Sequence, residues 1–421
     1  MAHSSAGRQL SLAAGFSLLL LAACTVRAQI PCGYEVQIIQ GPFCQPFGFP
    51  PTIAKGVSET GEVVGYYNAC VIGPGRAFRW TEETGLVTLE IPDGFTASGA
   101  EDIDSATGWI VGALQTPGTD GPFAAVWANG KVIDLGTMPG GDFSNARAIA
   151  SNPNPIIVGK WGNENLGPIH GFVWQDGVMT DLGPMLKADG SRAEDVNARG
   201  SITGWRREKP GGERIAYRLD DGVVTVLGPI PGGFTSEGRA ITSDSRTIVG
   251  VGRLFDQDTG DLLIHAFLWN ASGMLDIGTL PGFSWASAAD ITDGGVILVN
   301  AVEPGSTSTA FLWERGVMID LNSLIPCESG VEISGGFAIN SQGQITAGGH
   351  DQAGDVVALL LTPVQGPLGD LDMDCAVGVK DLLILLGRWG PCGDCDDCSA
   401  DLDGNCSVGV NDLLLLLGNW G

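Results

Sequence analysis

The chain has 421 residues, of which 48 are acidic and 22 basic, giving a formal net charge of −26. This excess of carboxylates argues against binding to nucleic acid or to an anionic membrane surface, because both need clustered cations. Glycine is frequent, at 64 residues, without a collagen period, which favours an all-β protein with many tight turns.

The first residues have the pattern of an export signal. The apolar run 10–23 is too short to span a bilayer but suits the core of a signal peptide. Cleavage after Ala28 predicts a signal peptide at residues 1–28. The alternative is cleavage before Cys24 at a lipobox-like sequence, which leaves a lipidated N-terminus. The prediction is an extracellular or cell-surface protein with no transmembrane segment in the mature chain.

The ten cysteines of an exported chain predict disulfides rather than reduced thiols. Nine remain after cleavage or lipidation at the first, so at least one lacks a partner within the chain. Cys44 and Cys70 fall in loops predicted to lie on one face, and we predict that they pair. Cys392, Cys395 and Cys398 follow one another at three-residue steps, for which export favours disulfides over a zinc site.

Residues 29–362 contain a repeat of about 47 residues, the length of one propeller blade. An aromatic phrase of the type Ala-Phe-x-Trp recurs in seven units, ending at Trp80, Trp127, Trp174, Leu219, Trp269, Trp313 and Leu361. In each unit an Ala-x-x-Ile segment and a Gly-ended apolar run precede this phrase, and a phrase of the type Val-x-Asp-Leu-Gly often follows it. Four short strands per unit predict a propeller blade.

The last unit lacks its fourth strand, and Tyr34–Pro42 at the front of the chain has the pattern of the missing one. An N-terminal strand that completes the last blade removes an open sheet edge. We therefore predict an all-β body, a seven-bladed β-propeller closed by an N-terminal strand. A β-solenoid is the alternative, and it would not need the displaced strand.

These phrases resemble the HAF-type extracellular repeat, named for a run that stands here as His265-Ala266-Phe267. The resemblance covers nearly all of residues 50–361. It implies an architecture and no particular activity.

The body contains no known catalytic motif, and no catalytic residue is predicted. An Asp recurs in the fourth strand of four units, which favours a structural role such as binding turn amides over catalysis. The histidines His170, His265 and His350 fall at scattered repeat positions. Aromatic residues near the predicted mouth suggest a sugar-stacking platform, with loop packing as the favoured alternative: Tyr66, Tyr67, Trp161, Trp205, Phe255 and Trp285.

After a linker at 363–369, residues 370–421 carry two calcium-type loops, Asp370–Asp381 and Asp401–Asp412. Both place oxygen-bearing side chains at positions 1, 3, 5 and 12 and offer a backbone carbonyl at position 7. A Leu-rich helix follows each loop, and the two helices are expected to pack together. The predicted ligands of the two Ca²⁺ ions are Asp370, Asp372, Asp374, Ala376, Asp381, Asp401, Asp403, Asn405, Ser407 and Asp412.

This duplication resembles the dockerin domain, a loop–helix pair in place of two full EF-hands. The resemblance implies a small all-α domain and a cohesin-like or other surface protein as partner. Cys375 and Cys406 replace the usual Gly at position 6, so either a strained turn or a disulfide is expected there. Positions 10 and 11 are Val379-Lys380 and Val410-Asn411 in place of the hydroxyl pair common in cellulosomal dockerins, which argues against cellulosomal partners.

The sequence as a whole predicts an exported, non-catalytic propeller that binds or displays a glycan or protein ligand and is tethered through a calcium domain. The alternative is a carbohydrate-active enzyme, a glycoside hydrolase or lyase, with its site at the propeller mouth. Dockerin-like tails often accompany such enzymes. Enzymatic activity is left open at this stage, with its absence favoured.

Overall fold

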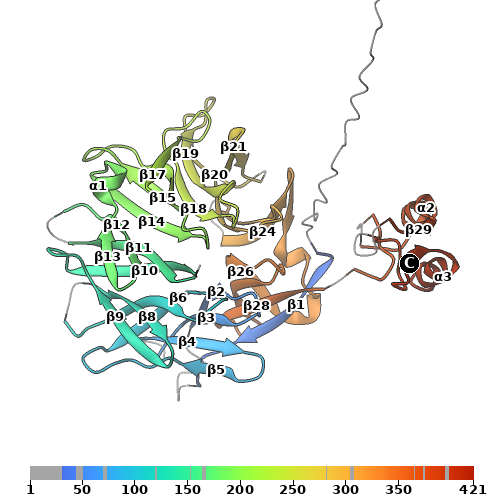
Figure 1. The fold of residues 1–421 in the computed structure, drawn as a ribbon, viewed down its shortest axis with the longest axis horizontal. Helices are drawn as coiled ribbons and strands as arrows, with labels where there is room; N and C mark the ends of the chain where they lie inside the picture. The colour runs from blue at the N-terminus through green and yellow to red at the C-terminus, as the bar shows by residue number, and fades with distance from the viewer. Residues whose placement is uncertain are drawn as a thin grey trace, which may run out of the picture.

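The computed structural model describes residues 31–43, 51–69, 74–118, 121–151, 153–163, 167–280, 282–303, 308–364, 366–372, 375–393 and 398–421. Four-stranded antiparallel sheets surround a central axis, which is the architecture of a β-propeller (Figure 1). A small helical unit lies beside the ring, next to β1 and β28. None of the helices in the described part of the chain has the length and apolarity that a membrane span needs.

Successive groups of four strands form the sheets in chain order, and one parallel bridge between Ile264 and Trp285 joins the fifth and sixth groups into an eight-stranded sheet. The first three groups are β2 (Thr52–Val57), β3 (Val63–Asn68), β4 (Gly75–Thr81) and β5 (Gly85–Thr88); β6 (Ala97–Ile103), β7 (Ile110–Gln115), β8 (Phe123–Ala128) and β9 (Lys131–Gly136); and β10 (Phe143–Ser151), β11 (Pro155–Gly162), β12 (His170–Gln175) and β13 (Val178–Asp181). The next three are β14 (Gly190–Val196), β15 (Ile202–Arg207), β16 (Ile215–Asp220) and β17 (Val223–Gly228); β18 (Glu237–Ile241), β19 (Ile248–Phe255), β20 (Leu262–Asn270) and β21 (Gly273–Gly278); and β22 (Trp285–Ile291), β23 (Ile297–Val302), β24 (Ser308–Glu314) and β25 (Val317–Asp320). These bounds agree with the four-strand pattern of the repeat.

The remaining sheet joins the two ends of the propeller. It contains β26 (Val331–Ile339), β27 (Ile345–Asp351), β28 (Val356–Val364) and, at its edge, β1 (Gly33–Ile39). β1 runs antiparallel to β28, with Gly33 opposite Val364 and Ile39 opposite Ala358. The predicted N-terminal strand therefore completes the sheet of the last repeat, and β28 extends two residues into the predicted linker.

Hydrogen bonds and apolar packing hold this last sheet against the first. The Asn340 side chain donates to the carbonyl of Ser58 (2.8 Å), and the Thr346 hydroxyl donates to that of Lys55 (3.0 Å). Tyr34 and Ile39 of β1 are both 1% exposed and pack into two different core clusters, one of which also contains residues of the first sheet. β1 is thus a buried part of the ring.

Every repeat of the ring has a β-bulge in its first strand, at the segment that corresponds to Ala-x-x-Ile. The pairing register shifts at 54/56, 100/102, 146/148, 193/195, 238/240, 288/290 and 336/338. A Cβ on Gly159, which ends the apolar run of β11, would lie 2.0 Å from the Asn145 carbonyl oxygen beside the bulge. This close approach explains why the run ends in glycine.

Short helices and the C-terminal unit complete the described chain. The body also contains α1 (Gly183–Leu186), η1 (Leu321–Ser323) and η2 (Cys327–Ser329), and the C-terminal unit contains α2 (Val379–Gly387), β29 (Gly390–Pro391), β30 (Ser407–Val408) and α3 (Val410–Gly418). Leu385 of α2 and Leu416 of α3 are fully buried in one small core, as expected for helices that pack together.

Candidate functional site

The two predicted calcium loops bring their carboxylates together. One oxygen each of Asp370, Asp372 and Asp381 lie within 4.8 Å of one another, and Asp401, Asp403 and Asp412 repeat this arrangement. Oxygens on opposite sides of a Ca²⁺ ion, each bonded at about 2.4 Å, are about 4.8 Å apart. The donors are all hard oxygen ligands, so both clusters fit calcium.

The carboxylate at position 12 organises each loop from the first turn of its helix. Asp381 is fully buried and accepts backbone N–H bonds from Leu371 (2.6 Å), Asp372 (2.9 Å) and Gly378 (2.7 Å). Burial acts to raise the pKa of Asp381, but these backbone hydrogen bonds outweigh it and the pKa is lowered. Asp412 is held in the same way, so both side chains are kept as carboxylates.

The position-3 carboxylates differ in their neighbours. Asp372 Oδ1 is buried without a hydrogen-bond partner, which suits an oxygen whose partner is a cation. The other oxygen of Asp372 lies 3.0 Å from Lys380 Nζ. At the same place in the second loop, Asn411 Nδ2 donates to Asp403 Oδ2 (3.1 Å).

The other predicted ligands have less specific surroundings. Asn405 is exposed, and its backbone N–H donates to the carboxylates of Asp401 and Asp403. Ala376 lies in the first loop and Ser407 begins β30, each in the stretch between the position-3 and position-12 carboxylates. Asp374 lies outside the described residues.

Both cysteines at position 6 have left-handed backbone conformations and form disulfides. The φ angles are 72° at Cys375 and 66° at Cys406. Cys375 is bonded to Cys32, 343 residues earlier in the chain, and Cys406 is also disulfide-bonded. Both expected features, a left-handed turn and a disulfide, therefore occur at each of these two cysteines.

The remaining cysteines fall into three groups. Cys392 pairs with Cys398, which confirms a disulfide in the triplet between the loops. Cys395, Cys44 and Cys70 lie outside the described residues, so the Cys44–Cys70 prediction falls there too. Cys327 is an exposed free thiol. The bonds described here suit an oxidising environment.

The C-terminal helices leave their outer faces exposed, contrary to the expectation that mutual packing would cover them. The unit is so small that each helix buries one side only. The exposed residues recur at identical steps in both helices and at the tryptophan two residues beyond each, and they are 44 to 63% exposed: Val379, Leu383, Leu386 and Trp389, and Val410, Leu414, Leu417 and Trp420.

A narrow channel of about 180 Å³ follows the axis of the ring. Two adjacent residues from the first strand of every sheet line it, and one of each pair is the bulged residue. A bulge re-aims a side chain, here toward the axis. The bulged residues are Lys55, Glu101, Arg147, Glu194, Arg239, Ala289 and Phe337.

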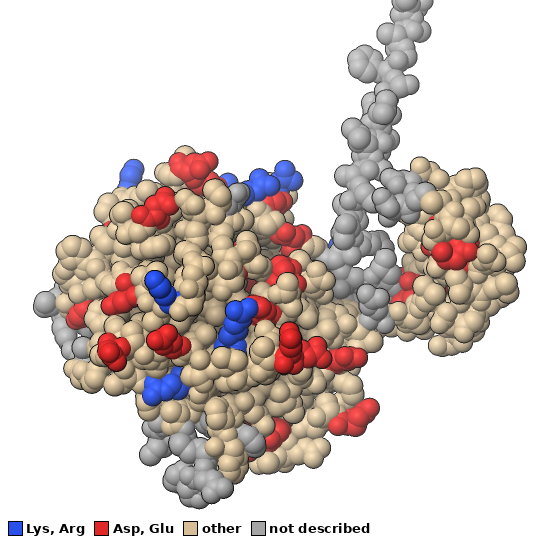
Figure 2. Space-filling model, turned by 60° about the horizontal axis from the view of Figure 1, so that its bottom comes forward, with Lys and Arg blue, Asp and Glu red and all other residues tan. Residues whose placement is uncertain are grey.

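Five of these bulged residues alternate in charge from sheet to sheet. Arg147 bridges Glu101 (3.0 Å) and Glu194 (3.3 Å), and Arg239 approaches Glu194 at 3.7 Å. Lys55 lies over the ring of Phe337, 4.6 Å from its centroid. On the outer face that Figure 2 displays, basic and acidic side chains are likewise interspersed.

The residue that follows the bulged residue also lines the channel, and in every other sheet it is an Asp. Each of these Asp side chains hydrogen-bonds to backbone N–H groups of two neighbouring sheets. Asp102 accepts the N–H of Ile103 in its own strand (2.8 Å) and that of Ile149 in the next sheet (2.9 Å). Asp195 and Asp290 repeat this pattern. Each keeps some surface open to the channel, yet burial raises the pKa of Asp102 to about 6, that of Asp290 to about 7 and that of Asp195 well above its ordinary value.

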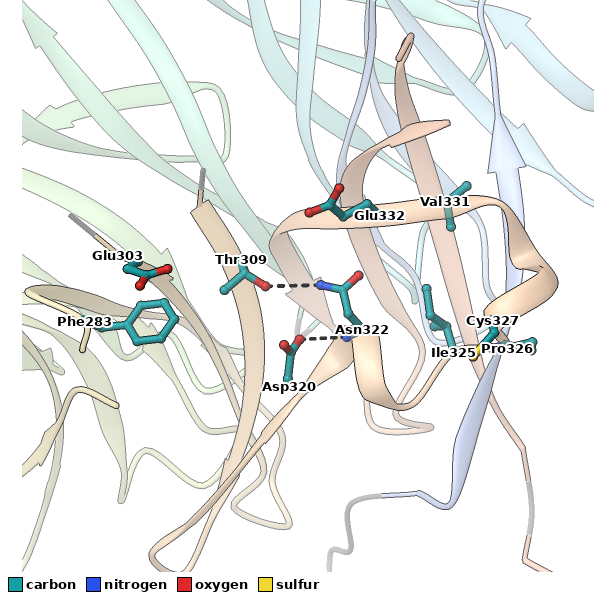
Figure 3. A pocket seen from close by; sticks show the side chains of 10 residues that line it. All are labelled: Phe283, Glu303, Thr309, Asp320, Asn322, Ile325, Pro326, Cys327, Val331 and Glu332. Carbon is teal, nitrogen blue, oxygen red and sulfur yellow. Dashed lines mark hydrogen bonds between the residues drawn. The ribbon is translucent and has the colours of Figure 1, made fainter. Parts of the chain in front are cut away.

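A larger cavity of about 380 Å³ opens between β24, β25 and the start of β26 (Figure 3). Asn322 organises it by donating to Thr309 Oγ1 (3.2 Å) and to the Ile333 carbonyl (3.0 Å). The lining includes three carboxylates and the free thiol, but these ten described residues include no Lys, Arg or His. They are Phe283, Glu303, Thr309, Asp320, Asn322, Ile325, Pro326, Cys327, Val331 and Glu332.

The predicted aromatic platform is divided between core and surface. Tyr67 is 7% and Trp205 is 4% exposed, so these two rings offer no open face to a ligand. Phe255 is 52% exposed and stacks on Phe234, with centroids 5.0 Å apart. Tyr66, Trp161 and Trp285 are half-buried. Tyr67 lies within β3 and Trp205 within β15, so both rings are buried parts of strands rather than packing for loops.

The recurring Asp of the fourth strand has the predicted structural role. Its carboxylate accepts a turn amide two residues later at Asp134, Asp181, Asp276 and Asp320. Two of these also bind a histidine: His170 Nδ1 lies 3.0 Å from Asp181, and His265 Nδ1 lies 2.9 Å from Asp276. These two histidines occupy one repeat position, a regularity that the sequence reading missed.

The comparisons with known proteins return structures alone. No family model matches the chain, and no curated protein matches its sequence. Similar solved structures include the β-propeller domain of the Trilobed protease from Pyrococcus furiosus, with 11% identity, a TM-score of 0.47, and 74% of this chain and 93% of that chain covered. An acylaminoacyl peptidase from Pyrococcus horikoshii (12%, 0.48) and a prolyl endopeptidase (11%, 0.47) match 74% and 79% of this chain. The matches cover about half the length of those two peptidases, 52% and 51%.

These findings correct the predicted function of the body. Several of the similar propellers belong to peptidases, and the interpretation as a non-catalytic binding or display module is contradicted. Identities of 11 to 13% concern the fold alone, and no peptidase activity is assigned to this chain.

The raised carboxyl pKa values in the channel predict a pH-dependent stability. A carboxyl whose pKa is higher in the folded than in the unfolded chain stabilises the fold below its unfolded value of 3.8. That contribution is lost as the pH rises through about 6 for Asp102 and about 7 for Asp290. We expect the free energy of unfolding, measured by urea denaturation in saturating calcium, to fall by about 2–4 kcal/mol between pH 5 and pH 7.5.

The informative quantity is how steeply the free energy of unfolding changes with pH, rather than its absolute value. A variant with Asp102→Asn and Asp290→Asn is less stable at every pH, because an amide nitrogen then faces a backbone N–H, but its stability should vary less between these pH values. Asp258→Asn, at an exposed turn, should keep the wild-type slope. An unchanged slope in the double variant would contradict the assignment.

Proposed function

We propose that this chain is an exported calcium-binding protein. In this proposal a seven-bladed β-propeller of HAF-type repeats, closed by β1, carries a dockerin-like domain that binds two Ca²⁺ ions. The observation that supports it most is the convergence of three carboxylates in each loop, to within 4.8 Å. The cavity between β24 and β26 supplies no comparable set of converging ligands.

In the proposed first site, the residues that would bind the ion come from both the loop and the helix. Asp370 and Asp372 offer carboxylates from the loop, and Asp381 offers one from the helix. The backbone N–H groups that hold Asp381 orient it before any ion arrives. Calcium would neutralise the mutual repulsion of these groups, and would thereby stabilise the loop and the helix behind it.

Calorimetric titration of the full chain with calcium tests the proposal. Wild type should bind two ions, with an increase in helical circular dichroism. Asp381→Asn and Asp412→Asn should each remove one site, because each loses a buried ligand and weakens its loop. Asp258→Asn should keep both sites. Failure of wild type to bind calcium in the millimolar range would refute the proposal.

Lys380 is expected to weaken the first site. Its ammonium group shares Asp372 with the ion and repels a divalent cation, although its side chain is 72% exposed and therefore screened. Lys380→Asn copies the second loop and should tighten the first site by about 3- to 10-fold. The reciprocal change, Asn411→Lys, should weaken the second site by a similar factor. Weaker calcium binding after Lys380→Asn, or tighter binding after Asn411→Lys, would disprove this role.

The partner implied by the dockerin resemblance, a cohesin-like or other surface protein, remains a prediction. The exposed faces of α2 and α3 are the surface that we propose for it. Binding to an immobilised cohesin module in calcium, weakened at least 10-fold by Trp389→Ala with Trp420→Ala, would support this. Each tryptophan is about half exposed, so its loss removes contact area without opening a core. Binding unaffected by the two changes would contradict the assigned surface.

A further inference from the structure

We propose that the first calcium loop has a second function: calcium bound there holds β1 on β28 and so keeps the propeller closed. The proposal rests on the calcium binding proposed above. It extends that binding from the C-terminal unit to the ring.

The link is the disulfide between Cys32 and Cys375. Cys32 directly precedes β1, and the two Cα atoms lie 5.3 Å apart although 343 residues separate them in sequence. Gly33, the first residue of β1, lies opposite Val364, the last residue of β28. The end of β28 is therefore joined to the start of β1 by a short covalent path, which runs through the first calcium loop and the disulfide.

β1 needs such a link because it is both terminal and at the edge of its sheet. It pairs with β28 on one side only. Edge strands near a chain terminus open most readily unless something ties them down. Opening here would also expose Tyr34 and Ile39, which are 1% exposed in the closed ring.

Cys375 is also part of the calcium loop. Its backbone N–H donates to Asp370 Oδ2 (3.0 Å), and its φ angle is 72°. Its position is thus tied to a carboxylate that would bind the ion. In the absence of an ion the clustered oxygens of Asp370, Asp372 and Asp381 repel one another, which loosens the attachment point of β1.

Cys406, at position 6 of the second loop, is also disulfide-bonded, but to none of the described cysteines. Cys392 and Cys398 pair within the C-terminal unit. The chain thus supplies a matched comparison: one disulfide that reaches β1 and one that does not. It also has one position-12 carboxylate in each loop, Asp381 and Asp412, so a single substitution can remove calcium binding from one loop at a time.

The size of the effect follows from linkage. If β1 opens only when the first loop has lost its ion, calcium slows opening by a factor of 1 + [Ca²⁺]/Kd. This is about 100-fold when calcium is 100 times the dissociation constant of the loop. Without the disulfide, opening no longer requires release of the ion, and the factor approaches 1.

Hydrogen exchange of the β1 amides in the full chain, with calcium or with a chelator, tests the proposal. Calcium should slow exchange about 100-fold in wild type and in the Cys392→Ser, Cys398→Ser variant. In the Cys32→Ser, Cys375→Ser variant the factor should fall below about 3, while calorimetry still detects calcium binding. Equal slowing in this variant and in wild type would overturn the proposal.

A second pair of variants keeps the disulfide and covers the case in which cysteine replacement prevents folding. Asp381→Asn should abolish the calcium effect on β1, and Asp412→Asn should preserve it. The reverse result, or an effect lost in both, would also overturn the proposal. Absence of calcium binding by wild type refutes the calcium sites themselves. Binding by wild type with unchanged β1 exchange refutes the second function alone.

Discussion

The structure depends on the pairing of β1 with β28. Sheets arranged in a ring must meet, and the sheet of the last repeat has only three strands from its own end of the chain. β1 supplies the fourth, and Tyr34 and Ile39 place apolar side chains into the cores on both sides of it. The pairing also brings Cys32 next to the point where the C-terminal unit begins. The disulfide between Cys32 and Cys375 is possible only because of that proximity.

The sequence predicts the strands well because the repeat records local constraints. The Ala-x-x-Ile segment becomes the bulged first strand, the Gly-ended run becomes the second, and the recurring Asp binds a turn amide. The channel is different. Its bulged residues occupy the variable positions of the phrase, so repetition conceals them. The bulge that turns Arg147 toward the axis becomes visible only from the pairing between β10 and β11.

The two carboxylate clusters were predictable because their residues lie within twelve positions of one another in the sequence. Their surroundings were not. Nine cysteines allow many pairings, and no local pattern joins Cys32 to Cys375. The expectation that the apolar helices would cover each other overlooked how little interior a unit of this size contains.

The bulges have a consequence for how such a channel changes over time. In each sheet one side chain projects to the axis from the bulged residue, which has no partner residue on the neighbouring strand. Exchanging that side chain alters the charge or width of the channel while the strands around it keep their partners. A ring of this design can acquire a new interior one substitution at a time, with the scaffold left intact.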